Sequence, residues 1–270
     1  MVAPAASRNT TRFLFVGSDN DGAAIPWSWT PSRHGWARGG TIGASMKPLS
    51  NQHLATMRRH MVEMVDIQFD VMADEIGKST PDERVRAAML QVPRHLFVPQ
   101  ELAAFAYQDT PLPIGFDKTI SQPFIAALML DLLALEPSSK VLEIGTGLGY
   151  QTAIIAALAA QVWSVEIVEE FAEQASVRLA QLGYTNVALR VGDGSRGWAE
   201  HAPFDRILVT AAVSEPPKAL LAQLNPAGRM VLPIGDADSQ QLSLIEKSAS
   251  DDLAIRAIIP ARFTQLETTA

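Results

Sequence analysis

Three glycines and an acid in the stretch Ser138–Thr152 (SSKVLEIGTGLGYQT) have a spacing that suits ligand binding. Gly145, Gly147 and Gly149 follow a G-x-G-x-G pattern, and Glu143 stands two positions before the first of them. A dinucleotide-binding turn requires G-x-G-x-x-G, and an acid is poorly placed beside a pyrophosphate. The pattern favours a ligand with an amino group, a positive charge and no phosphate, such as S-adenosylmethionine. The alternative is an ordinary strand, turn and helix whose glycines serve packing alone.

The flanking residues predict the elements that hold this turn. Lys140–Ile144 is a short, largely apolar run, as expected of a strand that is buried on both faces. The helix that follows, up to about Ala160, directs its free N–H groups back at the turn. A glycine-rich turn between a parallel strand and a helix is a common nucleotide site.

Two further acids stand at the ends of the next two predicted strands, where they could bind a nucleoside. Glu166 closes the strand Val162–Glu166, where a carboxylate can accept hydrogen bonds from both ribose hydroxyls of a nucleoside. Asp193 follows the strand Val187–Val191 and can accept a hydrogen bond from an adenine amino group. Taken alone, Glu166 also fits a solvated acid and Asp193 an Asp-Gly turn. Together with the glycine turn they indicate a class I S-adenosylmethionine-dependent methyltransferase.

Strands alternate with helices over residues 138–270, which predicts a Rossmann-like, doubly wound α/β core. We expect a mostly parallel sheet that is closed by antiparallel C-terminal strands. The predicted strands are Lys140–Ile144, Val162–Glu166, Val187–Val191, Arg206–Thr210 and Arg229–Ile234, and the closing pair is Gln241–Glu246 and Ala254–Phe263.

The first half of the chain has a different character. Residues 1–56 show no sustained apolar period and contain Trp27, Trp29 and Trp36, so we expect a poorly ordered extension. Residues 57–137 are predicted to form a helical segment that also shapes the substrate cleft.

Local signals divide that helical segment. The apolar period predicts a helix from Met57 to Gly77, and a capping box at Thr80–Glu83 predicts the start of a second helix. The prolines and glycine of Glu101–Ile120 predict a loop-rich stretch. Ser121 is predicted to cap a helix over Gln122–Leu135.

Composition excludes several classes of protein. The 270 residues contain 22 Lys and Arg against 29 Asp and Glu, a net charge of −7 with a pI of about 5.3, which argues against nucleic-acid binding. There are no cysteines, and five scattered histidines give no metal-ligand spacing. No apolar run approaches the ~20 residues of a membrane span. We expect a cytoplasmic monomer without a metal and without membrane or nucleic-acid partners.

The motifs contain no obvious general base, and this constrains the methyl acceptor. Methylation of an amine or hydroxyl usually requires a proton acceptor. A carboxylate, whose ordinary pKa is about 4, is already ionised and nucleophilic at neutral pH. The enzyme then has only to align it with the sulfonium methyl and exclude water.

Several segments together resemble the protein-L-isoaspartate O-methyltransferase family. They are Pro111–Gly115 (PLPIG), Thr119–Pro123 (TISQP), VLEIGTGLGYQTA and the GDG of Gly192–Gly194, with further matches at Arg94–Pro99, Ala202–Asp205 and Leu224–Arg229. The resemblance covers roughly Met57–Gly235, and TISQP is its most family-specific part. It implies methylation of the α-carboxylate of L-isoaspartyl residues in damaged proteins and peptides. S-adenosyl-L-methionine is the implied donor and S-adenosyl-L-homocysteine the product, and the ester collapses to a succinimide that reopens partly as aspartate.

The resemblance also implies roles for individual residues. Ser121 is the expected catalytic residue, beside the methyl donor and the substrate carboxylate, and Pro113, Ile114 and Gly115 are expected to contact the substrate. The expected cofactor contacts are Thr119, Ile120, Ser121, Glu143, Gly145, Thr146, Gly147, Gly149, Glu166, Ile167, Asp193 and Gly194. In this set, Glu166 and Ile167 would hold ribose and adenine, and Asp193 with Gly194 the adenine.

Two departures from the family pattern concern the substrate side. Leu148 stands where the family usually has a small residue, and Arg262–Leu266 replaces a Phe-Val-Pro-Leu-like strand that helps to shape the substrate cleft. With the long extension, they motivate a second hypothesis, a carboxyl methyltransferase that acts on aspartate in a dedicated peptide. A third hypothesis, a non-catalytic cofactor-binding or interaction protein, fits poorly with intact Ser121, Glu166 and Asp193.

Overall fold

The computed structural model describes residues 50–269. The predicted extension, with Trp27, Trp29 and Trp36, therefore lies almost entirely outside the described residues. Residues 57–137 and 138–269 belong to the same compact unit. Among the described residues, no helix combines the length and the apolar character that crossing a membrane requires.

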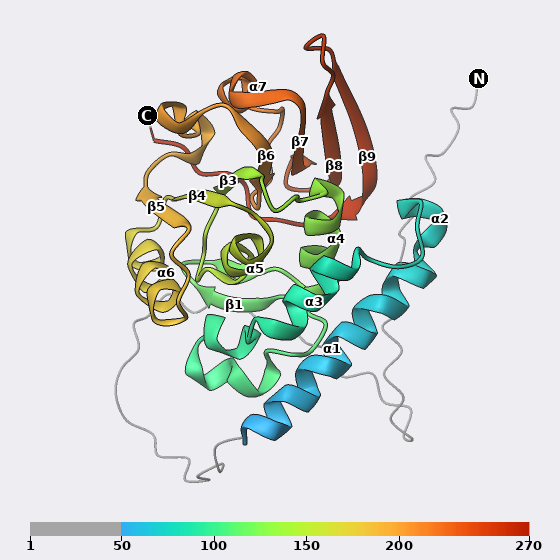
Figure 1. Cartoon of the computed structure of the whole chain (residues 1–270), viewed down its shortest axis with the longest axis vertical. Helices are drawn as coiled ribbons and strands as arrows, with labels where there is room; N and C mark the ends of the chain where they lie inside the picture. The colour runs from blue at the N-terminus through green and yellow to red at the C-terminus, as the bar shows by residue number, and fades with distance from the viewer. Residues whose placement is uncertain (1–49, 270) are drawn as a thin grey trace, which may run out of the picture. The chain divides into compact units, whose positions relative to one another are not determined.

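A seven-stranded sheet forms the centre of this unit, in the order β5-β4-β3-β6-β7-β8-β9 (Figure 1). Its first five members in that order are mutually parallel, and β8 and β9 continue the sheet antiparallel. The strands are β3 (Lys140–Ile144), β4 (Gln161–Glu166), β5 (Val187–Val191), β6 (Phe204–Val209), β7 (Leu224–Gly235), β8 (Gln240–Lys247) and β9 (Leu253–Ala261). The predicted sheet is confirmed, and its order reverses between β3 and β6, where open α/β sheets bind ligands.

Helices cover both faces of the sheet. The larger core cluster contains α4 (Pro123–Leu133), α5 (Tyr150–Leu158) and α6 (Glu169–Gln181), whereas α7 (Lys218–Gln223) packs in the second cluster. Residues of β3 alternate between the two clusters: Val141 belongs to the first, and Leu142 to the second. This burial on both faces explains why Val141, Leu142 and Ile144 are all apolar.

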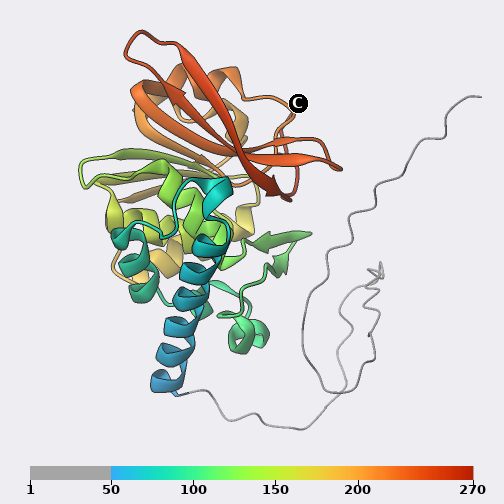
Figure 2. The same ribbon diagram turned by 90° about the vertical axis from the view of Figure 1, so that its right-hand side faces the viewer.

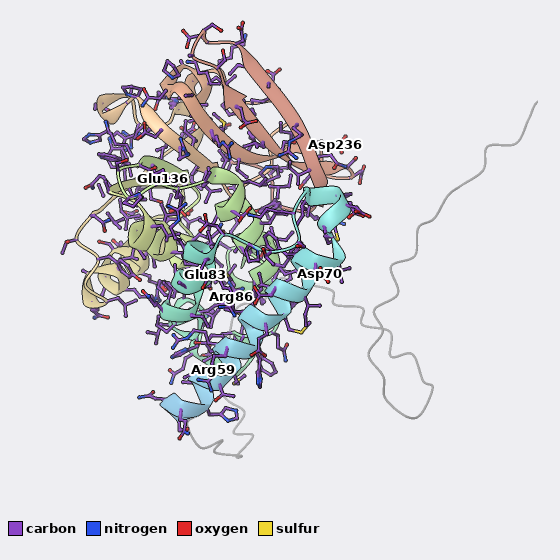
Figure 3. The ribbon with its side chains drawn as sticks, turned by 45° about the vertical axis from the view of Figure 1, so that its right-hand side comes forward. Arg59, Asp70, Glu83, Arg86, Glu136 and Asp236 are labelled. Carbon is purple, nitrogen blue, oxygen red and sulfur yellow. The ribbon has the colours of Figure 1, made fainter. Side chains whose placement is uncertain are left out.

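Of the N-terminal helices, the first and third pack as an outer layer over α4 and α5, and the second lies against β9. They are α1 (Asn51–Val71), α2 (Ala73–Ile76) and α3 (Glu83–Gln91), and α1 runs along the outside of the layer (Figure 2). Arg86 on α3, labelled in Figure 3, pairs with Asp66 on α1 at 2.9 Å. Buried side chains such as Phe69 on α1 join this layer to the larger core cluster.

Two helix starts differ from the predictions. Helix α1 begins at Asn51, before the expected start at Met57, because the Ser50 hydroxyl caps it by accepting a hydrogen bond from the His53 N–H at 3.2 Å. Helix α3 begins after Asp82 rather than at a box opened by Thr80, because the Asp82 carboxylate accepts from the Arg84 N–H at 2.8 Å.

The predicted loop-rich stretch Glu101–Ile120 contains a hairpin instead. Strands β1 (Leu112–Gly115) and β2 (Lys118–Ile120) pair antiparallel, preceded by 3₁₀ helices over Arg94–Phe97 and Gln100–Phe105. The hairpin turn is Phe116-Asp117, with φ of 50° and 55°. Positive φ at both central residues matches the twist of a two-residue hairpin.

The predicted cap of the helix after TISQP is also wrong. Helix α4 starts at Pro123, Gln122 occupies the N-cap position, and no side chain at that position bonds to the helix. The carboxylate of Asp109 instead accepts from the Phe124 N–H at 3.0 Å. Ser121 therefore precedes the cap and does not supply it.

Candidate active site

A pocket lies at the carboxyl ends of β3, β4 and β6. The space between these strand ends, including its mouth open to solvent, is about 600 Å³. Hairpin, strand ends and C-terminal segment all contribute to the lining: Ile114, Lys118, Thr119, Ile144, Gly145, Gly147, Val165, Glu166, Ile167, Phe171, Gly194, Thr210, Ala211, Thr264, Gln265, Leu266 and Glu267.

The glycine turn after β3 is fixed by both neighbouring strands. Gly145 N donates to the carbonyl of Val165 at 2.8 Å, next to the end of β4. On the other side, the Thr210 hydroxyl donates to the carbonyls of Ile144 at 3.0 Å and Gly145 at 2.8 Å. Gly145 has φ of 91°, and a Cβ there would overlap the Thr210 hydroxyl, so this position requires glycine.

Glu166 joins the turn to the end of β4. Its Oε2 accepts from the Gly147 N–H at 2.8 Å, and its Oε1 accepts from the Val168 N–H at 3.0 Å. A carboxylate oxygen can accept more than one hydrogen bond, so both oxygens keep the capacity to accept from a ligand. The residue lines the pocket, where the prediction placed it.

Glu143, in contrast, points away from the pocket. In β3 it alternates with Leu142 and Ile144 and faces α5, where its Oε2 accepts from the Thr152 hydroxyl at 2.5 Å and from Ser164 Oγ at 2.6 Å. Burial raises the pKa of Glu143 to about 7, although these two hydrogen bonds lower it. Both hydrogen bonds of Glu143 stay within the protein and the residue lies outside the pocket lining, so its expected contact with the cofactor stays a prediction.

Asp193 also bonds mainly within the protein. Its Oδ1 accepts from the N–H and the hydroxyl of Ser195 at 2.9 and 2.7 Å, and its Oδ2 accepts from the Thr269 N–H at 3.2 Å. Burial raises the pKa of Asp193, but these hydrogen bonds outweigh burial and hold it below its ordinary value. The neighbouring Gly194 lines the pocket, and a Cβ there would overlap Ile144.

The TISQP loop is held by a buried cation. Arg94 is fully buried, and its guanidinium donates to the carbonyls of Ser121 at 2.7 Å and Ala106 at 2.8 Å. Burial lowers the pKa of Arg94. The side chain of Ser121 does not belong to the pocket lining, whereas Thr119 does.

The structure thus brings only part of the predicted set together. Seven predicted residues line the pocket: Ile114, Thr119, Gly145, Gly147, Glu166, Ile167 and Gly194. The others lie outside the lining: Pro113, Gly115, Ile120, Ser121, Glu143, Thr146, Gly149 and Asp193. Sequence reasoning missed Thr210 and Glu267, and it named Thr264–Leu266 only as part of a departure from the strand that shapes the family's substrate cleft. The position of Thr210 directly after β6 was an available signal, whereas the C-terminal residues carry no periodic pattern.

Strand order, glycine turn and the acid that ends β4 together define a class I S-adenosylmethionine-dependent methyltransferase. A family model described as protein-L-isoaspartate(D-aspartate) O-methyltransferase matches residues 68–269. The chain belongs to this family. The predicted family, fold class and cofactor are therefore confirmed.

Individual relatives agree with this membership. The chain is 52% identical over 219 residues to protein-L-isoaspartate O-methyltransferase 1 of Polaromonas sp. (strain JS666), covering 81% of this chain and 93% of the relative. It is 54% identical over 187 residues to the protein-L-isoaspartate O-methyltransferase of Anaeromyxobacter dehalogenans (strain 2CP-C), covering 68% and 90%.

Two solved structures share the fold. One is a protein-L-isoaspartate O-methyltransferase with a TM-score of 0.65 and 28% identity, matched over 77% of this chain and 65% of that chain. The other is a putative protein-L-isoaspartate O-methyltransferase from Plasmodium falciparum in complex with S-adenosyl-L-homocysteine. It has a TM-score of 0.65 and 23% identity over 80% of this chain and 98% of that chain.

Proposed function

We propose that this enzyme transfers the methyl group of S-adenosyl-L-methionine to the α-carboxylate of L-isoaspartyl residues in damaged proteins and peptides. The observation that carries the proposal is the pocket at the β3–β6 switch point of a chain in this family. Bound there, the donor supplies an electrophilic methyl group on its sulfonium. The chain acts in the cytoplasm as a monomer and needs no nucleic acid.

The pocket residues fit this donor. Glu166 accepts hydrogen bonds from the ribose hydroxyls, in addition to those it accepts from the backbone. Gly145 and Gly194 line the pocket, and packing requires glycine at both positions because a Cβ would overlap Thr210 or Ile144. Ile144 and Ile167 offer apolar surface to the adenine.

The acceptor requires alignment rather than proton removal. An isoaspartyl carboxylate is ionised at neutral pH, so the attacking oxygen carries no proton. We assign the alignment to Ser121, whose loop is fixed by the hydrogen bond from buried Arg94 to its carbonyl. The Ser121 hydroxyl makes no hydrogen bond within the described part of the chain, and it donates to the substrate carboxylate.

A methyl-transfer assay on matched isoaspartyl and aspartyl peptides tests the proposal. The expected result is transfer of labelled methyl to the isoaspartyl peptide, with little transfer to the aspartyl one. Preference for the aspartyl peptide would support the alternative of a dedicated peptide substrate, motivated by the unusual residues Thr264 and Gln265 in the pocket wall. Failure to methylate either peptide while the donor still binds would refute the assigned activity.

A further inference from the structure

The C-terminal segment Thr264–Glu267 forms one wall of the pocket although it lies beyond the last strand. The backbone of Ala212, in the loop after β6, fixes its path. Ala212 N donates to the Thr264 carbonyl at 2.8 Å, and Leu266 N donates to the Ala212 carbonyl at 2.7 Å. Leu266 also packs against the second core cluster. The wall is therefore built into the fold.

An ion pair joins this wall to the hairpin. Lys118 Nζ, at the start of β2, donates to the Glu267 carboxylate, and both residues line the pocket. The Lys118 side chain is 20% exposed and that of Glu267 is 57% exposed, so the pair lies at the mouth of the pocket rather than at its floor. An ion pair with this exposure contributes little to stability, and water or another anion can replace either partner.

The charges of the pocket differ with depth. Glu166, which is buried, and the glycine turn line the pocket at the ends of β3 and β4, and the Glu166 carboxylate offers hydrogen-bond acceptors to the donor. Among the described residues of the lining, Lys118 is the one cation. The methyl acceptor is a carboxylate on a protein or peptide, and such a substrate has to enter through the mouth. An ammonium group there meets the carboxylate with a charge-assisted hydrogen bond.

We propose that Lys118 binds the carboxylate of the incoming isoaspartyl residue, and that Glu267 occupies this place until the substrate displaces it. The inference rests on the proposed function, because it presumes a carboxylate substrate. Glu267 then acts as an internal competitor, and Lys118 as a residue that selects negatively charged acceptors. No bond forms or breaks in the exchange.

The test measures methyl transfer by the full chain to an isoaspartyl peptide at saturating donor, with donor dissociation constants from calorimetric titration. Lys118→Gln is expected to raise KM for the peptide about tenfold, the loss of one hydrogen bond to a charged group, with kcat within about twofold. Lys118→Arg keeps the charge and is expected to restore most of the affinity. Glu267→Gln is expected to lower KM about threefold, because the competent state becomes more populated. The double variant should match Lys118→Gln.

Two exposed residues outside the pocket lining provide matched controls. Lys218→Gln and Glu215→Gln change the net charge in the same way and should leave KM within about twofold. An unchanged KM in Lys118→Gln would overturn the inference. A higher donor dissociation constant in Lys118→Gln would also overturn the inference, because it would assign Lys118 to the donor's own carboxylate.

The remaining outcomes separate this inference from the function on which it rests. A raised KM in Glu267→Gln would show that the pair supports the wall and does not compete, which overturns the inference alone. A wild-type enzyme that binds the donor and methylates no isoaspartyl peptide would overturn the proposed function, and this inference with it.

Discussion

The carboxylate of Glu166 accepts a hydrogen bond from the backbone N–H of Gly147 at 2.8 Å. One side chain at the end of β4 thereby fixes the turn that follows β3. Its other oxygen accepts from the Val168 N–H at 3.0 Å, at the start of α6. The residue proposed to bind the ribose of the donor is therefore also the one that shapes the turn around it.

Glu166→Ala is expected to weaken donor binding more than it slows methyl transfer, because the reacting atoms lie elsewhere. Hydrogen bonds to a charged group contribute about 1.5–3 kcal/mol, so the dissociation constant should rise roughly 10- to 100-fold. Calorimetric titration with S-adenosylmethionine measures this effect. Glu170→Ala, an exposed change on α6, is the matched control. An unchanged dissociation constant for Glu166→Ala would remove it from the ribose site.

Ser121→Ala is expected to lower turnover roughly 10- to 100-fold, since it removes one hydrogen bond of about 1.5–3 kcal/mol to the substrate carboxylate. Thermal unfolding should change little, because Asp109 and not Ser121 bonds to the start of α4. The pH profile should keep a plateau above the pKa of the substrate carboxylate, as no enzyme base titrates. Turnover at saturating donor, measured beside a thermal melt, tests both statements. Equal rates in variant and wild type would leave Ser121 without a catalytic role.

Glu143→Gln is expected to change how stability depends on pH. The pKa of Glu143 rises from 4.5 to about 7 through burial, so the native state favours the protonated form. Its contribution to stability is fully present below about pH 4.5 and is lost as the pH rises through about 7. Glutamine does not ionise. Between pH 4.5 and 8 the unfolding free energy of Glu143→Gln minus that of the wild type should therefore rise by about 3 kcal/mol. Urea unfolding at the two pH values measures the shift. A difference that stays constant with pH would contradict it.

Gly145→Ala is expected to destabilise the fold by more than a matched change elsewhere. Gly145 and Gly183 both have positive φ, of 91° and 83°, but a Cβ at Gly183 meets nothing within 4 Å. Gly183→Ala therefore reports strain alone, about 1–2 kcal/mol. Gly145→Ala adds the overlap with the Thr210 hydroxyl, and Thr210→Ala in the same chain should recover part of that excess. Equal losses of unfolding free energy in Gly145→Ala and Gly183→Ala would show that the Thr210 side chain moves aside without destabilising the fold.

The parallel strands were predictable because their signals are local. Lys140–Ile144 and Val187–Val191 have the bounds that their apolar runs predict, and the glycines mark where the first of them ends. The family-specific motifs identified the same edge of the sheet. Glu166 could be placed in the site because a strand-end position determines where its side chain lies.

Features that depend on distant contacts were not predictable. The hairpin turn uses Phe116 and Asp117 at positive φ, and phenylalanine is a residue type that gives no signal of this conformation. The start of α4 is bonded by Asp109, which precedes the helix by a whole loop and a hairpin. Glu143 was assigned to the ligand from its spacing to the glycines. That spacing does not show that its side chain packs against α5.

The C-terminal wall gives the pocket two parts with different tolerance to substitution. The strand ends beneath it are part of the sheet. Few substitutions at Gly145 or Glu166 therefore preserve both the fold and donor binding. Thr264–Glu267 lie beyond the last strand and are held mainly through backbone hydrogen bonds to Ala212, which most residue types can form. Substitutions in this wall can therefore change the acceptor side of the pocket while the sheet and the donor side persist.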